Sequence, residues 1–334
     1  MRTVRRVLSG SVTALVLAVS LPAVAAAAAG PHIVTLGTLG GSCCSEAMAI
    51  NDDGVVTGYA MIDVARNTHH AFRWKGGVMT DLGTLGGDRS FATAINDNGW
   101  IVGYSELTPG DLVTHAFLWR PGIGMTDLGL PGSASLATGI SDSGVIVGHY
   151  LLDGDFHGFR WAAGVTTTIT GPDGARFMPA GINKYGKLGG TLGTTPPGDP
   201  ATWKNGQVVA SGLIGNATAI NDNGDVSGTY GDSRQGAFVW RADGTVLHLS
   251  MPAGGEQALT TGINESRHTV GSRSAVDGST RAVYWSEFGT PRLLPGLWAG
   301  GWSGAQDVNR LGQTVGMAYR TGSAYDYVAV MWTR

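Results

Sequence analysis

A three-residue motif recurs seven times along this chain, and its spacing constrains the fold more than any other feature. Each copy has a turn residue preceded by Ile or Val, a glycine seven residues later, and a tryptophan 19 to 23 residues after the turn residue. Successive turn residues lie 38 to 45 residues apart. Periods of about 40–50 residues are typical of propellers, solenoids and arrays. The turn residues are Asn51, Asn96, Ser141, Asn183, Asn221, Asn264 and Asn309. The tryptophans are Trp74, Trp119, Trp161, Trp203, Trp240, Trp285 and Trp332.

The second repeat predicts four short strands joined by tight turns. Residues 92–95 form a first strand, which ends in the turn Asn96-Asp97-Asn98-Gly99, where Asn and Asp cap the backbone and Gly takes a positive φ. The next strands are predicted at 100–104, 115–119 and 125–128, because Val, Ile, Phe and Trp favour strands. Glycine or proline interrupts every run before a helix could form. Each repeat therefore predicts one four-stranded antiparallel blade.

The two ends of the chain predict that the blades close into a ring. The last repeat stops at Trp332 without a fourth strand, whereas residues 32–41 match the outer strand at 79–87. We therefore expect residues 33–39 to pair with 328–332. A ring of blades buries both faces of every sheet and leaves only short edges. The sequence predicts an all-β, seven-bladed β-propeller that is closed by its N-terminal strand.

The first 29 residues have the composition of an export signal. Three arginines lie among the first six residues, an apolar stretch covers 7–21, and an alanine run at 25–29 offers small-residue cleavage sites. The alternative is an uncleaved N-terminal anchor. We expect residues 1–29 to be a signal peptide, residues 30–334 to be one propeller domain, and the protein to be secreted.

Charge and cysteine content exclude several classes of partner and linkage. Three of the 22 basic residues and none of the 25 acidic residues lie in the first 29, so the remainder carries a net charge of −6. This charge argues against nucleic acid and anionic membranes as partners. Cys43 and Cys44 are adjacent and cannot cross-link distant loops. We expect a monomer that is stabilised by packing.

Several segments of the sequence resemble motifs of the HAF-repeat family of extracellular repeat proteins. They are Asp81-Leu82-Gly83-Thr84-Leu85-Gly86-Gly87, the stretch from Ala94 to Gly99, and the triplets His70-Ala71-Phe72 and His115-Ala116-Phe117. The resemblance covers residues 32–334 and is strongest up to about residue 161. It implies export and a repeat scaffold, and it supplies neither catalytic residues nor a substrate.

No residue pattern predicts catalysis, a cofactor or a metal site. His70, His115 and His157 occupy the same place in three successive repeats, so a ring separates them and prevents them from sharing one ion. A structural hydrogen bond is the favoured role for them. The Asn-Asp-x-Gly turns lack the spaced oxygen ligands and the final Glu of a calcium loop.

Loops on one side of the ring are the remaining candidates for function, because repeat scaffolds usually bind through variable connections. Aromatic and acidic residues there would suit stacking on sugar rings or recognition of a basic peptide. We therefore predict a module that binds carbohydrate or protein. The alternatives are an extracellular carbohydrate-active enzyme with two loop carboxylates and a structural envelope protein. For Trp298 and Trp302, capping of the last blade junction is equally open. The candidate ligand-binding residues are Trp298, Trp302, Phe91, Phe177, Asp153 and Asp155.

Overall fold

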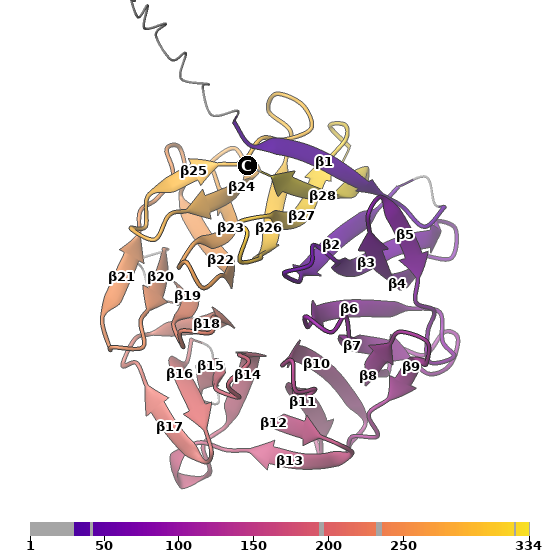
Figure 1. The fold of residues 1–334 in the computed structure, drawn as a ribbon, viewed down its shortest axis with the longest axis vertical. Helices are drawn as coiled ribbons and strands as arrows, with labels where there is room; N and C mark the ends of the chain where they lie inside the picture. Colours follow the sequence, from indigo (N-terminus) through magenta and orange to yellow (C-terminus); the bar gives the residue numbers. More distant parts are fainter. Residues whose placement is uncertain (1–29, 41–42, 194–196, 232–235, 324, 334) are drawn as a thin grey trace, which may run out of the picture. The chain divides into compact units, whose positions relative to one another are not determined.

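A computed structural model describes residues 30–40, 43–193, 197–231, 236–323 and 325–333. The predicted signal peptide therefore lies outside the described residues. Residues 31–334 form one compact unit of seven four-stranded antiparallel sheets arranged in a ring (Figure 1). The prediction of a seven-bladed β-propeller is confirmed. None of the described residues belongs to a helix with the length and apolar character needed to cross a membrane.

Each blade runs from an inner strand at the axis to an outer strand at the rim. The inner strands are β2 (Ser45–Ile50), β6 (Ser90–Ile95), β10 (Ala134–Ile140), β14 (Phe177–Ile182), β18 (Gly215–Ile220), β22 (Gln257–Ile263) and β26 (Ser303–Val308). The second strands are β3 (Val56–Asp63), β7 (Ile101–Glu106), β11 (Ile146–Leu152), β15 (Leu188–Leu192), β19 (Val226–Tyr230), β23 (Thr269–Ser274) and β27 (Thr314–Tyr319). The third strands are β4 (Thr68–Lys75), β8 (Thr114–Arg120), β12 (Asp155–Ala162), β16 (Asp199–Lys204), β20 (Ala237–Trp240), β24 (Thr280–Trp285) and β28 (Tyr327–Thr333). The outer strands are β5 (Val78–Asp81), β9 (Gly124–Asp127), β13 (Val165–Ile169), β17 (Gln207–Ala210), β21 (Val246–Leu249), β25 (Pro291–Leu293) and β1 (His32–Gly37), and one 3-10 turn spans Pro172–Gly174.

A β-bulge in every inner strand explains the repeated glycine. The pairing between inner and second strands shifts by one residue in all seven blades, for example between Ala92 and Ala94. The bulge turns a backbone carbonyl toward the second strand, where Phe91 O approaches the Gly103 Cα so closely that a Cβ would overlap it. The other six repeat glycines face an inner-strand carbonyl in the same way. Glycine is therefore required at this position because the inner-strand carbonyl approaches the second strand too closely for a side chain, and not because of a turn.

The N-terminal strand completes the last blade, as the sequence predicts. β1 pairs antiparallel with β28, with His32 opposite Thr333 and Thr35 opposite Val330. Leu36 is buried in a cluster that includes Phe72 of the first repeat and Met331 of the last. The closing strand therefore joins blades that come from opposite ends of the chain.

Tryptophans of the third strands fill the junctions between blades. Trp285 and Trp332 are almost completely buried, and their indole nitrogens donate to the carbonyls of Ser250 and Pro295 at 2.9 and 2.8 Å. Each carbonyl belongs to the preceding inter-blade loop. The indole thus fills volume and also satisfies a polar group in a buried junction.

The two cysteines are free thiols, in agreement with a fold that has no long-range cross-link. The Cys44 thiol lies 3.2 Å from the carbonyl oxygen of Tyr325, and burial raises its pKa to about 12. Cys43 contacts the sulfur of Met61. These contacts are local to the closing blade and its neighbour.

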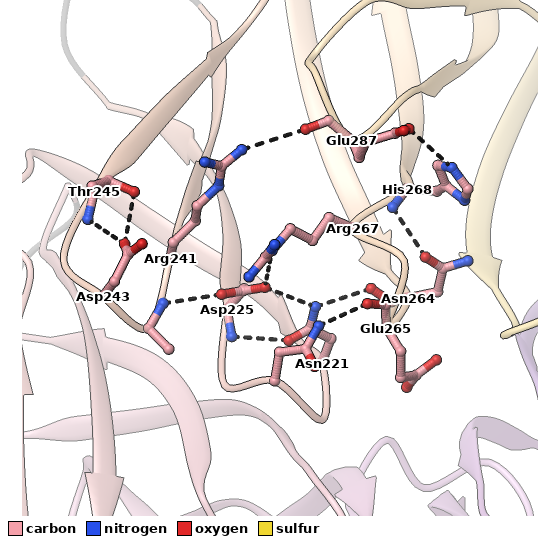
Figure 2. A network of polar contacts seen from close by, with 12 residues as sticks. Asn221, Asp225, Arg241, Asp243, Thr245, Asn264, Glu265, Arg267, His268 and Glu287 are labelled. Carbon is pink, nitrogen blue, oxygen red and sulfur yellow. Dashed lines mark hydrogen bonds and ion pairs between the residues drawn. The ribbon is translucent and has the colours of Figure 1, made fainter.

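The seven turn residues form a belt of hydrogen bonds around the axis. In six blades, the Asn Nδ2 donates to the carbonyl of the turn residue in the next blade, over 2.9–3.2 Å. The last of these bonds runs from Asn309 back to Asn51. Each Asn Oδ1 accepts from the backbone N–H four residues later, such as that of Trp100. Figure 2 shows this arrangement for Asn221 and Asn264, where Asp225 and Arg267 extend it.

We expect Leu36→Ala to lower the free energy of unfolding by about 2–5 kcal/mol, because it opens a cavity in the closing blade. Val34→Ala on the same strand is the control, since Val34 is 46% exposed and its loss should cost no more than about 0.5 kcal/mol. Chemical denaturation measures both values. Equal, small effects would mean that β1 does not hold the ring closed.

Ser141 is the one turn residue too short to reach the next blade, so the belt has a gap before Asn183. We expect Ser141→Asn to raise the free energy of unfolding by about 0.5–1.5 kcal/mol, because it adds the missing hydrogen bond to the Asn183 carbonyl. Ser141→Ala, which cannot form the bond, should not stabilise the protein. A Ser141→Asn variant that melts at or below the temperature of Ser141→Ala would contradict the belt as a source of stability.

Candidate functional site

The two sides of the ring carry different connections. Because the strands alternate in direction, the turns between first and second strands and between third and fourth strands share one side, which we call the turn face. The connections between second and third strands and between blades share the other side, the loop face. The two faces present different chemistry around the central channel.

On the turn face, the belt residues surround a cavity of about 350 Å³. Its acidic lining residues are Asp52, Asp97, Asp142, Asp222, Glu265 and Asp307. Most of these carboxylates hold neighbouring turns: Asp97 Oδ1 accepts the N–H of Asp52 at 3.0 Å, and Asp52 Oδ1 accepts the N–H of Arg310 at 2.9 Å. Within the described part of the chain, no three His, Cys, Asp or Glu side chains are grouped to hold a metal ion. The turn-face acids therefore act as scaffold.

Asp307 occupies an unusual place in the channel wall. The corresponding residue after the bulge is alanine or glycine in the other six inner strands, as at Ala49 and Gly262. Its two oxygens accept the N–H groups of Ile50 and Val308 at 3.0 and 2.8 Å. Burial outweighs these two bonds and raises the pKa of Asp307 to about 6.

On the loop face, partly buried aromatic rings follow one another across three blades. Trp302 contacts Tyr319 edge-on with ring centroids 5.6 Å apart, and Tyr319 lies 5.9 Å from Tyr327. The Tyr327 hydroxyl is hydrogen-bonded to that of Tyr59. The Tyr59 ring contacts Phe91 edge-on, with ring centroids 5.0 Å apart. Phe91 stacks on Tyr104 at 5.1 Å. We call this series, together with Trp298, the aromatic arc. Its blades are the yellow closing blade and the two indigo-to-purple blades beside it (Figure 1).

A cavity of about 210 Å³ lies at one end of the arc. It is lined by Trp298, Trp302, Tyr319, Thr321 and Gly322. Both indoles remain 40% exposed. The Trp298 ring lies against Gly300 and Gly301, and a Cβ at Gly301 would come within 2.9 Å of the indole nitrogen. The glycine-rich loop thus leaves room for the indole to lie close to the backbone.

Hydrogen-bonding groups accompany the rings along the arc. Glu46 on the inner strand β2 accepts from the Tyr59 hydroxyl at 2.6 Å and from Gln306 Nε2 at 2.7 Å. Burial, followed by the charge of Glu46, raises the pKa of Tyr59, so its hydroxyl stays protonated. Among the described residues, Glu46 is the carboxylate that accepts a hydrogen bond from an aromatic side chain of the arc, the Tyr59 hydroxyl. The arc therefore combines ring faces with hydroxyl, amide and carboxylate groups.

The predicted site residues do not converge on one place. Trp298, Trp302 and Phe91 all belong to the aromatic arc. Phe177 was predicted on the exposed loop face, and this placement is wrong: its side chain is completely buried in a core cluster with Leu188, because β14 begins at this residue and the ring points between sheets.

Asp153 and Asp155 lie in another blade, on the hairpin between β11 and β12. Asp153 holds the positive φ of that turn, and Asp155 forms an ion pair with Arg176 at 2.7 Å. Tyr59, Tyr104 and Tyr319 were not predicted from the sequence. Tyr59 and Tyr104 share one position, directly after the repeat glycine, which was the available signal for these two.

The histidines of the first two triplets have structural partners. His70 and His115 contact Asp81 and Asp127 on the adjacent outer strands at 2.9 and 2.8 Å. These contacts match the hydrogen-bonding role expected for them. They join third and fourth strands within a blade and contribute nothing to the channel.

No family model matches the sequence, and no curated relative matches it. Solved structures do resemble the fold. A streptogramin B lyase aligns with a TM-score of 0.60 at 12% identity, covering 91% of this chain and 97% of that one. A virginiamycin B lyase from Staphylococcus aureus, an inactive variant with quinupristin, gives 0.60 at 11% identity over 91% and 99% of the two chains. The β-propeller domain of the trilobed protease from Pyrococcus furiosus, which has an open velcro topology, gives 0.53 at 11% identity over 87% and 92%. The likeness is one of fold. At these identities it assigns neither substrate nor activity.

The raised pKa of Asp307 predicts a pH-dependent stability. Its folded-state pKa of about 6 exceeds the usual 3.8, so its contribution is fully present below pH 3.8 and is lost as pH rises through 6. Relative to wild type, Asp307→Asn should gain about 2–3 kcal/mol of unfolding free energy between pH 4 and 7. Asp307→Ala should show the same change of unfolding free energy with pH relative to wild type, together with a larger loss of unfolding free energy at every pH. Denaturation at several pH values tests this, and a flat difference would contradict it.

Proposed function

We propose that this protein is an exported binding module that holds an oligosaccharide along the aromatic arc of its loop face. One observation supports this proposal above all: the aromatic side chains of the arc contact one another in an unbroken series. Partly buried rings in three neighbouring blades lead to two indoles that are 40% exposed, and exposed indoles of this kind cost free energy unless a ligand covers them. Sugar rings offer flat C–H faces for stacking and hydroxyls for the polar groups between the rings.

The cavity between Trp298 and Trp302 would hold one sugar ring of the chain. Two indoles whose outer faces are open form walls for such a ring, and Thr321 supplies a hydroxyl at the edge. Tyr319 then leads toward Tyr59, where Glu46 and Gln306 offer an acceptor and a donor to sugar hydroxyls. Ligand pockets commonly combine aromatic walls with a few placed polar groups in this way.

Binding accounts for the arc better than glycoside hydrolysis does. Hydrolysis requires two carboxyl groups about 5–9.5 Å apart across the scissile bond. Among the described carboxylates of the arc, Glu46 has both oxygens engaged by Tyr59 and Gln306, and Asp326, beside the cavity, is engaged by Thr321 and Arg320. A carboxylate held in this way positions its neighbours and is poorly placed to donate a proton or attack a sugar.

A glycan array with the purified protein, followed by calorimetry on the best binder, tests the proposal. We expect Trp302→Ala and Trp298→Ala each to weaken binding about tenfold or more, because each removes a stacking wall. Phe288→Ala is the matched control, since Phe288 is 77% exposed on the turn face. Its binding should equal that of wild type.

Thermal melts separate binding from folding in this experiment. Trp302→Ala loses its edge contact with Tyr319 and should cost only about 0.5–1.5 kcal/mol. A large fall in melting temperature with unchanged glycan affinity would make Trp302 a core residue and remove the cavity from the site. An array on which no glycan binds would refute the carbohydrate proposal itself.

A further inference from the structure

A second cavity lies on the loop face, across the ring from the aromatic arc. It has a volume of about 530 Å³ and is formed by β10, β11, β12, β14, β15 and β18, the magenta-to-pink blades in Figure 1. Its size falls within the range of small-molecule sites, about 300–1,000 Å³. The residues that carry the argument are His149, Phe156, Arg176, Met178 and Thr191.

A small side chain at one repeat position contributes to the space here. The position after the repeat glycine is Tyr59 in the first blade and Tyr104 in the second, and it is Thr191 in the fourth. Thr191 lines the cavity, and its hydroxyl accepts the N–H of Ala217 at 3.1 Å. A tyrosine-sized volume is therefore missing from the wall at this point.

The walls combine an apolar surface with two oriented polar groups. Phe156 is 47% exposed, and Met178 is a flexible apolar neighbour. His149 Nε2 lies 3.0 Å from the Pro179 carbonyl, so Nε2 carries the proton and Nδ1 has a lone pair. Burial lowers the pKa of His149 to about 4, which keeps the ring neutral at neutral pH. The histidine is thus a hydrogen-bond acceptor rather than a cation.

Arg176 supplies the charge. Its Nη2 donates to Asp155 Oδ1 at 2.7 Å, and the Asp155 side chain is 69% exposed. An ion pair so open to water is weak and is exchanged readily for another carboxylate. The planar guanidinium can bind such a carboxylate through two parallel hydrogen bonds.

We propose that this cavity binds a small aromatic carboxylate that carries a ring hydroxyl. The ring lies against Phe156 and Met178, the carboxylate replaces Asp155 on Arg176, and the hydroxyl donates to His149 Nδ1. This site is separate from the proposed oligosaccharide site, and neither depends on the other.

Calorimetry with 4-hydroxyphenylacetate as the probe tests the site. The neutral amide of the probe and phenylacetate, which lacks the hydroxyl, should each bind about tenfold more weakly than the probe, because each loses one polar contact. Arg176→Gln should remove the preference for acid over amide and leave the preference for the hydroxyl. Equal affinities for all three compounds would overturn the proposal.

Thr191→Tyr, which restores the residue of the first two blades, should fill the cavity and abolish binding of the probe. Thr229→Tyr is the matched control, because Thr229 holds the same position one blade later and its hydroxyl accepts the Thr260 N–H in the same way. Both variants should melt at similar temperatures. Binding that survives Thr191→Tyr, or is lost equally in Thr229→Tyr, would place the probe elsewhere and refute the assignment. Should Thr191→Tyr fail to fold, Arg176→Gln alone decides.

Discussion

The belt of asparagine side chains at the axis is the interaction on which the ring depends. Inner strands meet at the axis without pairing with one another, so the backbone groups at their ends need partners other than a neighbouring strand. An asparagine can serve both sides at once: Oδ1 closes its own turn, and Nδ2 reaches the next blade. Aspartate lacks the donor, and serine lacks the length. This requirement explains why the turn residue repeats while the residues around it vary.

The belt and the bulges fix the inner strands, whereas side chains at other repeat positions vary between blades. The position after the repeat glycine illustrates this freedom. It holds an aromatic ring at Tyr59 and Tyr104, an imidazole at His149 and a small hydroxyl at Thr191. One side of the ring consequently has an aromatic surface and the other has a cavity. The scaffold is nearly symmetric, whereas its binding chemistry is not.

The spacing of asparagine, glycine and tryptophan was sufficient to predict the blades, because each of these residues is required by local geometry. Closure was predicted from residues 32–41, which match the outer strand that the last repeat lacks. The aromatic arc could not be predicted in the same way, since Tyr327 and Tyr59 are joined only when the ring closes. The cavity near Thr191 depends on how side chains of three blades pack together, which a motif search does not register. Phe177 was misplaced because a strand boundary moved by a few residues turns a loop residue into a core residue.

The closing strand also sets the direction in which the molecule faces. Because β1 and β28 run antiparallel with His32 opposite Thr333, both ends of the propeller emerge at the same edge of one blade, on the turn face. The rings of the arc and the cavity beside Phe156 open on the other face. A partner protein fused at either end would therefore lie beside the turn face and leave both candidate sites open on the other face. The topology of a single strand pair thus decides which face a fusion would cover.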